Sequence, residues 1–77
     1  VLSSDMRERG NAAFASKRFH EAIEWYTAAA KVEPCDSRPL ANRAAAFLEV
    51  GDYAACEDDV AEALLLVEPE AVRKSAK

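Results

Sequence analysis

The feature that most constrains this chain is an internal repeat with a period of 34 residues. When the sequence is shifted by that distance, large apolar residues fall on large apolar ones and small residues fall on small ones. The matched pairs are Gly10 with Ala44, Phe14 with Leu48, Phe19 with Tyr53, Ala22 with Cys56, Ala29 with Ala63, and Val32 with Leu66. A unit of this length cannot bury its apolar face alone, so neighbouring units stack. The sequence therefore predicts stacked repeats.

Composition indicates that the repeats are helical. Alanine is abundant, the 77 residues include 2 glycines, and no segment shows the sustained alternation of apolar and polar residues that marks a half-buried strand. A chain of this length holds one small domain, which buries about 60% of its unfolded surface. We therefore expect a single all-α domain over residues 1–77.

Capping and breaking signals divide the first repeat into two helices. Ser4 is a good N-cap for a helix over about residues 4–16, and Lys17-Arg18 forms a short turn. A second helix is expected over about residues 20–33, where Pro34 ends it. The first repeat is therefore a helix–turn–helix unit.

The second repeat carries the same signals. Asp36 or Ser37 caps a third helix that ends at Gly51, and Asp52 caps a fourth that continues to about Val67. Pro69 follows, and residues 70–77 have the pattern of a fifth helix of which only the start is present.

Small residues at helical spacing indicate where two helix backbones approach closely. These packing positions are Gly10, Ala22 and Ala29 in the first repeat and Ala44, Cys56 and Ala63 in the second. Cys56 is therefore interpreted as a small buried packing residue rather than a nucleophile. The two cysteines, Cys35 and Cys56, are too few and too far apart for a disulfide framework or a zinc pair, so both are expected to be reduced.

Charge and hydropathy exclude several classes of function. A net charge of −4 argues against general binding to nucleic acid or to an anionic membrane, because these partners require an excess of positive charge. The longest apolar runs fall far short of the roughly 20 residues that span a bilayer. The polar N-terminal segment also lacks the pattern of a signal peptide. We expect an intracellular, cytoplasmic protein.

The titratable residues predict no catalytic, metal or cofactor site. His20 is the single histidine and has no acidic partner nearby in the sequence. The acidic run Glu57-Asp58-Asp59, with Glu62, lacks the alternating ligands and central glycine of a calcium loop and is expected to form a solvated face. The chain is therefore expected to be a binding module rather than an enzyme.

The repeat resembles the tetratricopeptide repeat, a helix–turn–helix unit of 34 residues. The matching positions are Gly10-Asn11, Phe14, Phe19, Ala22-Ile23, Tyr26, Ala29 and Pro34, then Asn42-Arg43, Phe47, Gly51-Asp52-Tyr53, Cys56 and Ala63. Tyr26 is interpreted as a core residue and Trp25 as partly exposed. The resemblance implies a right-handed superhelical solenoid of two repeats, about 3–36 and 37–69, followed by a partial capping helix at 70–77.

In such a stack the first helix of each pair lines a concave groove. Arg7 and Asn11 share one face of the first groove helix because they lie four residues apart. Asn42 lies on the second groove helix, and Ala45 and Ala46, one turn further on, are expected to leave the groove floor open. Mid-helix asparagine is locally unfavourable, which indicates a use for Asn11 and Asn42.

This set resembles the dicarboxylate clamp of co-chaperone tetratricopeptide domains. The resemblance assigns clamp roles to Arg7, Asn11, Asn42, Arg73 and Lys77. Pro69 follows Ala63 by one residue more than Pro34 follows Ala29, so Lys74 is an alternative to Arg73. Where this family has a lysine in its first clamp position, the chain has Arg7, whose planar guanidinium keeps the charge and adds a fork of donors.

The resemblance implies a co-chaperone or adaptor that binds the C-terminal Glu-Glu-Val-Asp tail of heat-shock protein 90 or 70. The alternative is a scaffold for complex assembly or self-association, in which the apolar end of the fourth helix, residues 64–67, forms a dimer or docks on another domain. Outside that hypothesis, the rest of a fifth helix, a longer C-terminal helix or another copy of the chain would cover these residues. The two hypotheses differ in whether a free peptide carboxylate is recognised.

Overall fold

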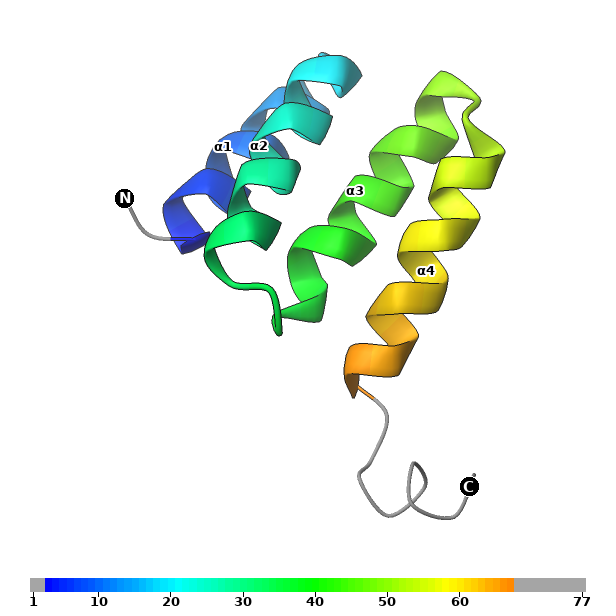
Figure 1. The fold of residues 1–77 in the computed structure, drawn as a ribbon. Helices are drawn as coiled ribbons and strands as arrows, with labels where there is room; N and C mark the ends of the chain where they lie inside the picture. The colour runs from blue at the N-terminus through cyan, green and yellow to red at the C-terminus, as the bar shows by residue number, and fades with distance from the viewer. Residues whose placement is uncertain (1–2, 68–77) are drawn as a thin grey trace, which may run out of the picture.

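The computed structural model describes residues 3–67, which form four α-helices in two antiparallel pairs (Figure 1). The helices are α1 (Ser3–Ala15), α2 (Phe19–Val32), α3 (Ser37–Val50) and α4 (Tyr53–Val67). Each helix packs against the next, and α1 also reaches α3. No strand occurs in this part of the chain, so the all-α prediction is confirmed and the expected helix ends agree to within one residue. The fifth helix expected at residues 70–77 lies outside the described residues.

Both hairpins are closed by the same helix-ending geometry. After α1, the N–H of Lys17 donates to the carbonyl of Phe14 and the N–H of Arg18 to that of Ala13. After α3, Gly51 and Asp52 make the equivalent pair of bonds to carbonyls in the last turn. This is the Schellman motif, which requires a left-handed residue. Gly51 has a φ of 83° and Lys17 a φ of 63°.

Side-chain caps start the helices of the second repeat where the sequence predicts them. The N–H of Arg38 donates to Asp36 Oδ1 at 3.0 Å, and the N–H of Ala55 donates to Asp52 Oδ1 at 3.2 Å. The Arg38 side chain also donates to Asp36, and these hydrogen bonds hold the pKa of the Asp36 carboxyl below its ordinary value. Asp36 therefore stays ionised, as an N-cap carboxylate should.

The core lies where α1, α2 and α3 meet. Ala13, Ala22, Tyr26 and Ala46 form the buried cluster, and Phe14 and Ile23 pack against it. Burial of Ala46 corrects the expectation that it forms part of an open groove floor, because its methyl group faces the core cluster. Ala45, one residue earlier, is exposed.

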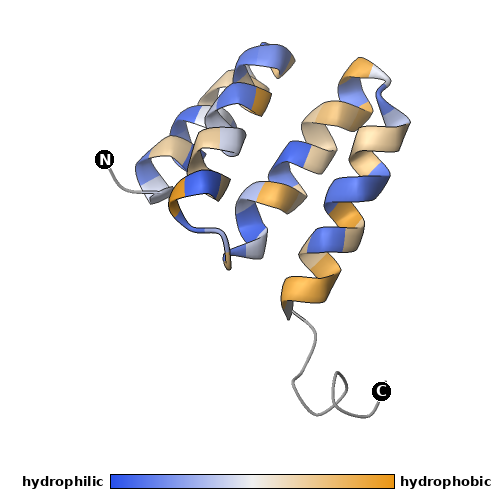
Figure 2. Cartoon of the chain, viewed as in Figure 1, coloured by the Kyte–Doolittle hydropathy of each residue, from blue (hydrophilic) through white to orange (hydrophobic). Residues whose placement is uncertain are grey.

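The packing positions differ in burial between the two repeats. Gly10, Ala22, Ala29 and Ala44 are buried, whereas Cys56 and Ala63 are half-buried, so Cys56 departs from the full burial expected for it. Apolar residues recur along α4, between charged ones, and α4 forms one side of the four-helix layer (Figure 2). No further helix of the described chain covers that side, and Leu64 and Leu65 stay about 60% exposed.

Candidate functional site

The hydroxyl of a buried tyrosine on α2 and an asparagine amide on α3 both donate to the side-chain oxygen of Asn11 on α1. Tyr26 lies on α2 with 2% of its surface exposed, as expected for a core residue. Its hydroxyl donates to Asn11 Oδ1 at 2.6 Å, and Asn42 Nδ2 donates to the same oxygen at 3.4 Å. Two candidate residues, one from each groove helix, are therefore brought together across 31 positions of sequence.

Arg7 lies one turn before Asn11 on α1 and is half-buried. Its Nε is buried and has no hydrogen-bond acceptor within residues 3–67. The guanidinium also acts on Tyr26: burial raises the pKa of the phenol above its ordinary 10.0, and the charge of Arg7 opposes this shift more weakly. The phenol is therefore protonated at neutral pH and acts as a donor.

The hydrogen bonds orient the Asn11 amide. Because Oδ1 of Asn11 already accepts from Tyr26 and Asn42, both N–H groups of its Nδ2 remain for another acceptor. Arg7 adds guanidinium donors from the same face of α1. The exposed side of this cluster, Arg7, Asn11 and Asn42, therefore presents donors, which is the chemistry that binds a carboxylate.

The remaining candidates, Arg73, Lys77 and the alternative Lys74, lie outside the described residues. Their assignment remains a prediction from the sequence.

Arg43 forms a second polar centre that the sequence reasoning missed. Its Nε and a terminal nitrogen donate to the two carboxylate oxygens of Asp59 at 2.7 and 2.6 Å, and its other terminal nitrogen donates to Thr27 Oγ1 at 3.0 Å. These bonds raise the pKa of Arg43 and join α2, α3 and α4. The cluster is satisfied internally, so its role is structural.

The prediction that the acidic run is wholly solvated is wrong for Asp59, which is 6% exposed. A signal was present: Asp59 follows Cys56 by three residues and precedes Ala63 by four, so it shares the packing face of its helix. Its equivalent in the first repeat is Trp25, over which Arg9, the equivalent of Arg43, stacks at 5.3 Å from the ring centre. The two repeats thus place the same arginine against different partners.

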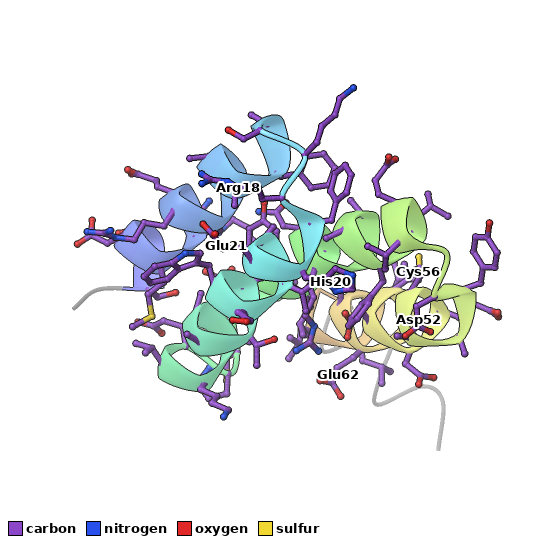
Figure 3. All side chains as sticks on the ribbon, turned by 90° about the horizontal axis from the view of Figure 1, so that it is seen from above. Arg18, His20, Glu21, Asp52, Cys56 and Glu62 are labelled. Carbon is purple, nitrogen blue, oxygen red and sulfur yellow. The ribbon has the colours of Figure 1, made fainter. Side chains whose placement is uncertain are left out.

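The other titratable residues form no competing site. His20 is exposed at the start of α2 and lies apart from Arg18 and Glu21, which pair with each other at 3.8 Å (Figure 3). Within residues 3–67 no group of three metal-ligating side chains comes together. None of the four helices is long and apolar enough to cross a membrane.

No protein-family model matches the chain. The chain is similar to the Hsp70-Hsp90 organizing protein 1 of Arabidopsis thaliana, with 42% identity over 57 residues, which are 74% of this chain and 10% of that protein. It superposes on the tetratricopeptide domain of Arabidopsis OM64 with a TM-score of 0.84 and 38% identity, covering 86% of this chain and 55% of the other. The chain belongs to the tetratricopeptide-repeat family.

A second tetratricopeptide structure bears on the groove. It is the second such domain of Spaghetti (RPAP3), bound to the HSP90 peptide SRMEEVD, with a TM-score of 0.84 and 32% identity over 86% of this chain and 61% of the other. The chain spans about a tenth of the length of curated relatives such as the Hsp70-Hsp90 organizing protein 1. The similarity therefore concerns one repeat domain of longer proteins.

Proposed function

We propose that this tetratricopeptide domain binds the C-terminal Glu-Glu-Val-Asp tail of heat-shock protein 90 or 70 and acts as a cytoplasmic co-chaperone or adaptor module without enzymatic activity. The observation that carries the proposal is that Tyr26 and Asn42 both donate to Oδ1 of Asn11, which leaves the N–H groups of Asn11 as donors one helical turn from Arg7. The similarity to a domain bound to SRMEEVD supports it.

Each clamp residue has a distinct role in this proposal. Arg7 meets a terminal carboxylate through the terminal nitrogens of its charged guanidinium. Asn11 and Asn42 supply N–H donors that orient the carboxylates without adding positive charge. Arg73, or Lys74, meets acidic side chains and Lys77 a terminal carboxylate. A few charge-assisted bonds predict affinity in the micromolar range, about −8 kcal/mol.

Calorimetric titration of the full chain with the peptide SRMEEVD tests the proposal. The free-acid peptide is expected to bind with micromolar affinity, and the same peptide with an amidated C-terminus is expected to bind at least tenfold more weakly. Equal affinity for both peptides, or binding of neither, would refute the clamp.

Two substitutions locate the binding site. Arg7→Ala and Asn42→Ala are each expected to weaken binding of the free acid by about tenfold or more, since each removes a bond worth about 1.5–3 kcal/mol when a charge takes part. Arg9→Ala is the matched control: it removes an arginine from the same helix, but one that stacks on Trp25. If Arg9→Ala lost binding while Arg7→Ala and Asn42→Ala kept it, the binding site would lie elsewhere.

A scaffold function is the second candidate, and one observation favours it. Ser37, Ala41, Val60, Ala63 and Leu64 line a shallow apolar groove of about 290 Å³ between α3 and α4. Sedimentation equilibrium distinguishes the candidates, because self-association through this groove gives a mass that rises with concentration and falls back in Leu64→Glu. A monomer that binds the free-acid peptide would support the first candidate.

A further inference from the structure

Tyr26 occupies an unusual position, with its ring in the core and its hydroxyl at the polar cluster. The ring packs so closely over Gly10 that a Cβ there would lie 2.5 Å from ring carbon Cε1. Gly10 precedes Asn11 in the sequence, so the missing side chain allows the phenol to reach the asparagine beside it. The fold thus places the hydroxyl of the buried Tyr26 against the Asn11 side chain.

An asparagine amide can rotate by half a turn and exchange its oxygen for its nitrogen. In one orientation Asn11 offers two N–H donors to the groove, and in the other it offers an oxygen, which would repel a carboxylate. The 2.6 Å bond from Tyr26 selects the first orientation, because the hydroxyl needs an acceptor. The contact from Asn42 Nδ2, at 3.4 Å, is too long to fix the orientation of the Asn11 amide strongly.

We propose that Tyr26 is a positioning residue of the groove: its hydroxyl holds the Asn11 amide with Nδ2 toward the bound carboxylate. Tyr26 acts through Asn11 and does not touch the ligand itself. The inference rests on the proposed function, since it explains how one clamp residue is made ready for an anion.

Comparison of the two repeats supports this pairing. The residues equivalent to Asn11 and Tyr26 in the second repeat are Ala45 and Val60. The asparagine and the hydroxyl are therefore present together in one repeat and absent together from the other.

Substitution of Tyr26 by Phe tests the inference, because it removes the hydroxyl and keeps the ring. We expect Tyr26→Phe to weaken binding of free-acid SRMEEVD about fivefold, the effect of one neutral hydrogen bond. Thr27→Val is the matched control: it removes a part-buried hydroxyl from the same helix, one that donates to the Ile23 carbonyl and accepts from Arg43. Thr27→Val is expected to retain wild-type affinity.

A double-mutant cycle separates positioning from general packing. In an Asn11→Ala background Tyr26→Phe is expected to have no further effect on affinity, since the residue it positions is gone. An unchanged affinity in Tyr26→Phe alone, or the same fivefold loss in both backgrounds, would overturn the inference.

Nuclear magnetic resonance of the side-chain amides provides a readout that does not depend on binding. The Asn11 amide pair, assigned by its absence in Asn11→Ala, is expected to shift in Tyr26→Phe, because the oxygen of that amide loses the hydrogen bond from the phenol. If the wild type fails to bind SRMEEVD, the proposed function falls, and this spectrum then decides the positioning by itself. An Asn11 amide pair that is unchanged in Tyr26→Phe would overturn it.

Discussion

Tyr26 packs over Gly10 at a distance that leaves no room for a side chain, since a Cβ on Gly10 would stand 2.5 Å from Cε1 and 2.7 Å from Cδ1 of the ring. The equivalent residues of the second repeat are Ala44 and Val60. The residues at these positions therefore differ in size and in burial: a glycine against a buried tyrosine in the first repeat, and an alanine with a valine that is 44% exposed in the second. The close approach of paired helices is kept in both.

Gly10→Ala is expected to destabilise the domain by about 1–3 kcal/mol, because overpacking against the ring outweighs the better helix propensity of alanine. Urea unfolding followed by circular dichroism measures the change. In a Tyr26→Val background, which reproduces the second repeat, the same substitution is expected to be neutral or stabilising. A destabilisation of equal size in both backgrounds would show that the ring is not the cause.

Lys17→Gly is expected to stabilise the domain by about 0.5–1 kcal/mol. Lys17 has a φ of 63°, where a side chain is strained, and its equivalent in the second repeat is Gly51 with a φ of 83°. Relief of strain exceeds the entropy that glycine adds to the unfolded chain. Thermal unfolding should show a rise in Tm of about 2–8 °C. The reverse change, Gly51→Lys, should lower Tm; a fall with Lys17→Gly would contradict the account.

Asp59→Ala is expected to lower the free energy of unfolding by about 2 kcal/mol, because it leaves the half-buried guanidinium of Arg43 without its carboxylate. Asp58→Ala is the control, since Asp58 is the exposed neighbour on the same helix and should change stability by less than about 0.5 kcal/mol. Chemical denaturation of both variants provides the comparison, and equal effects would mean that the ion pair contributes nothing specific.

Stability is expected to fall at high pH through Tyr26. Burial raises the pKa of the folded phenol above the 10.0 of the unfolded chain. Between these two values the unfolded chain has lost a proton that the folded chain keeps, so the free energy of unfolding decreases as pH rises through this window. Below pH 10.0 both states are neutral and Tyr26 contributes no pH dependence.

Urea unfolding at a series of alkaline pH values measures this decrease, and Tyr26→Phe should remove part of it. Because the charge of Arg7 lowers the pKa of Tyr26, the variant Arg7→Met should move the phenol titration to still higher pH. Ultraviolet absorbance, with Tyr26→Phe subtracted, follows that titration. A downward movement in Arg7→Met would show that the guanidinium does not face the phenol.

Local signals in the sequence predict the helices well. The N-caps Asp36 and Asp52 and the left-handed Gly51 stand where the sequence places them, because caps and helix ends depend on a few neighbouring residues. The left-handed conformation of Lys17 is not indicated by the residue type, since lysine does not favour that conformation. It follows from the repeat, which closes both hairpins with the same hydrogen bonds.

The candidate site is predicted in part. A resemblance identifies Arg7, Asn11 and Asn42 as candidates, and the structure brings Asn42 and the hydroxyl of Tyr26 to Oδ1 of Asn11. Local periodicity identifies Tyr26 as a core residue, but it does not predict which residue accepts the hydrogen bond of its hydroxyl. Asp59 shows the same limit, because an acid in an acidic run is expected in solvent until a partner on another helix is known.

The sequence by itself determined the helical class, the 34-residue repeat and the ends of each helix, because these depend on composition, period and neighbouring side chains. The tertiary structure alone decided which hydrogen-bond donors of Asn11 remain unpaired and which charges are buried. Those outcomes depend on how helices cross, since a hydrogen bond over 15 or 16 positions of sequence forms only once packing has set the distance between the helices.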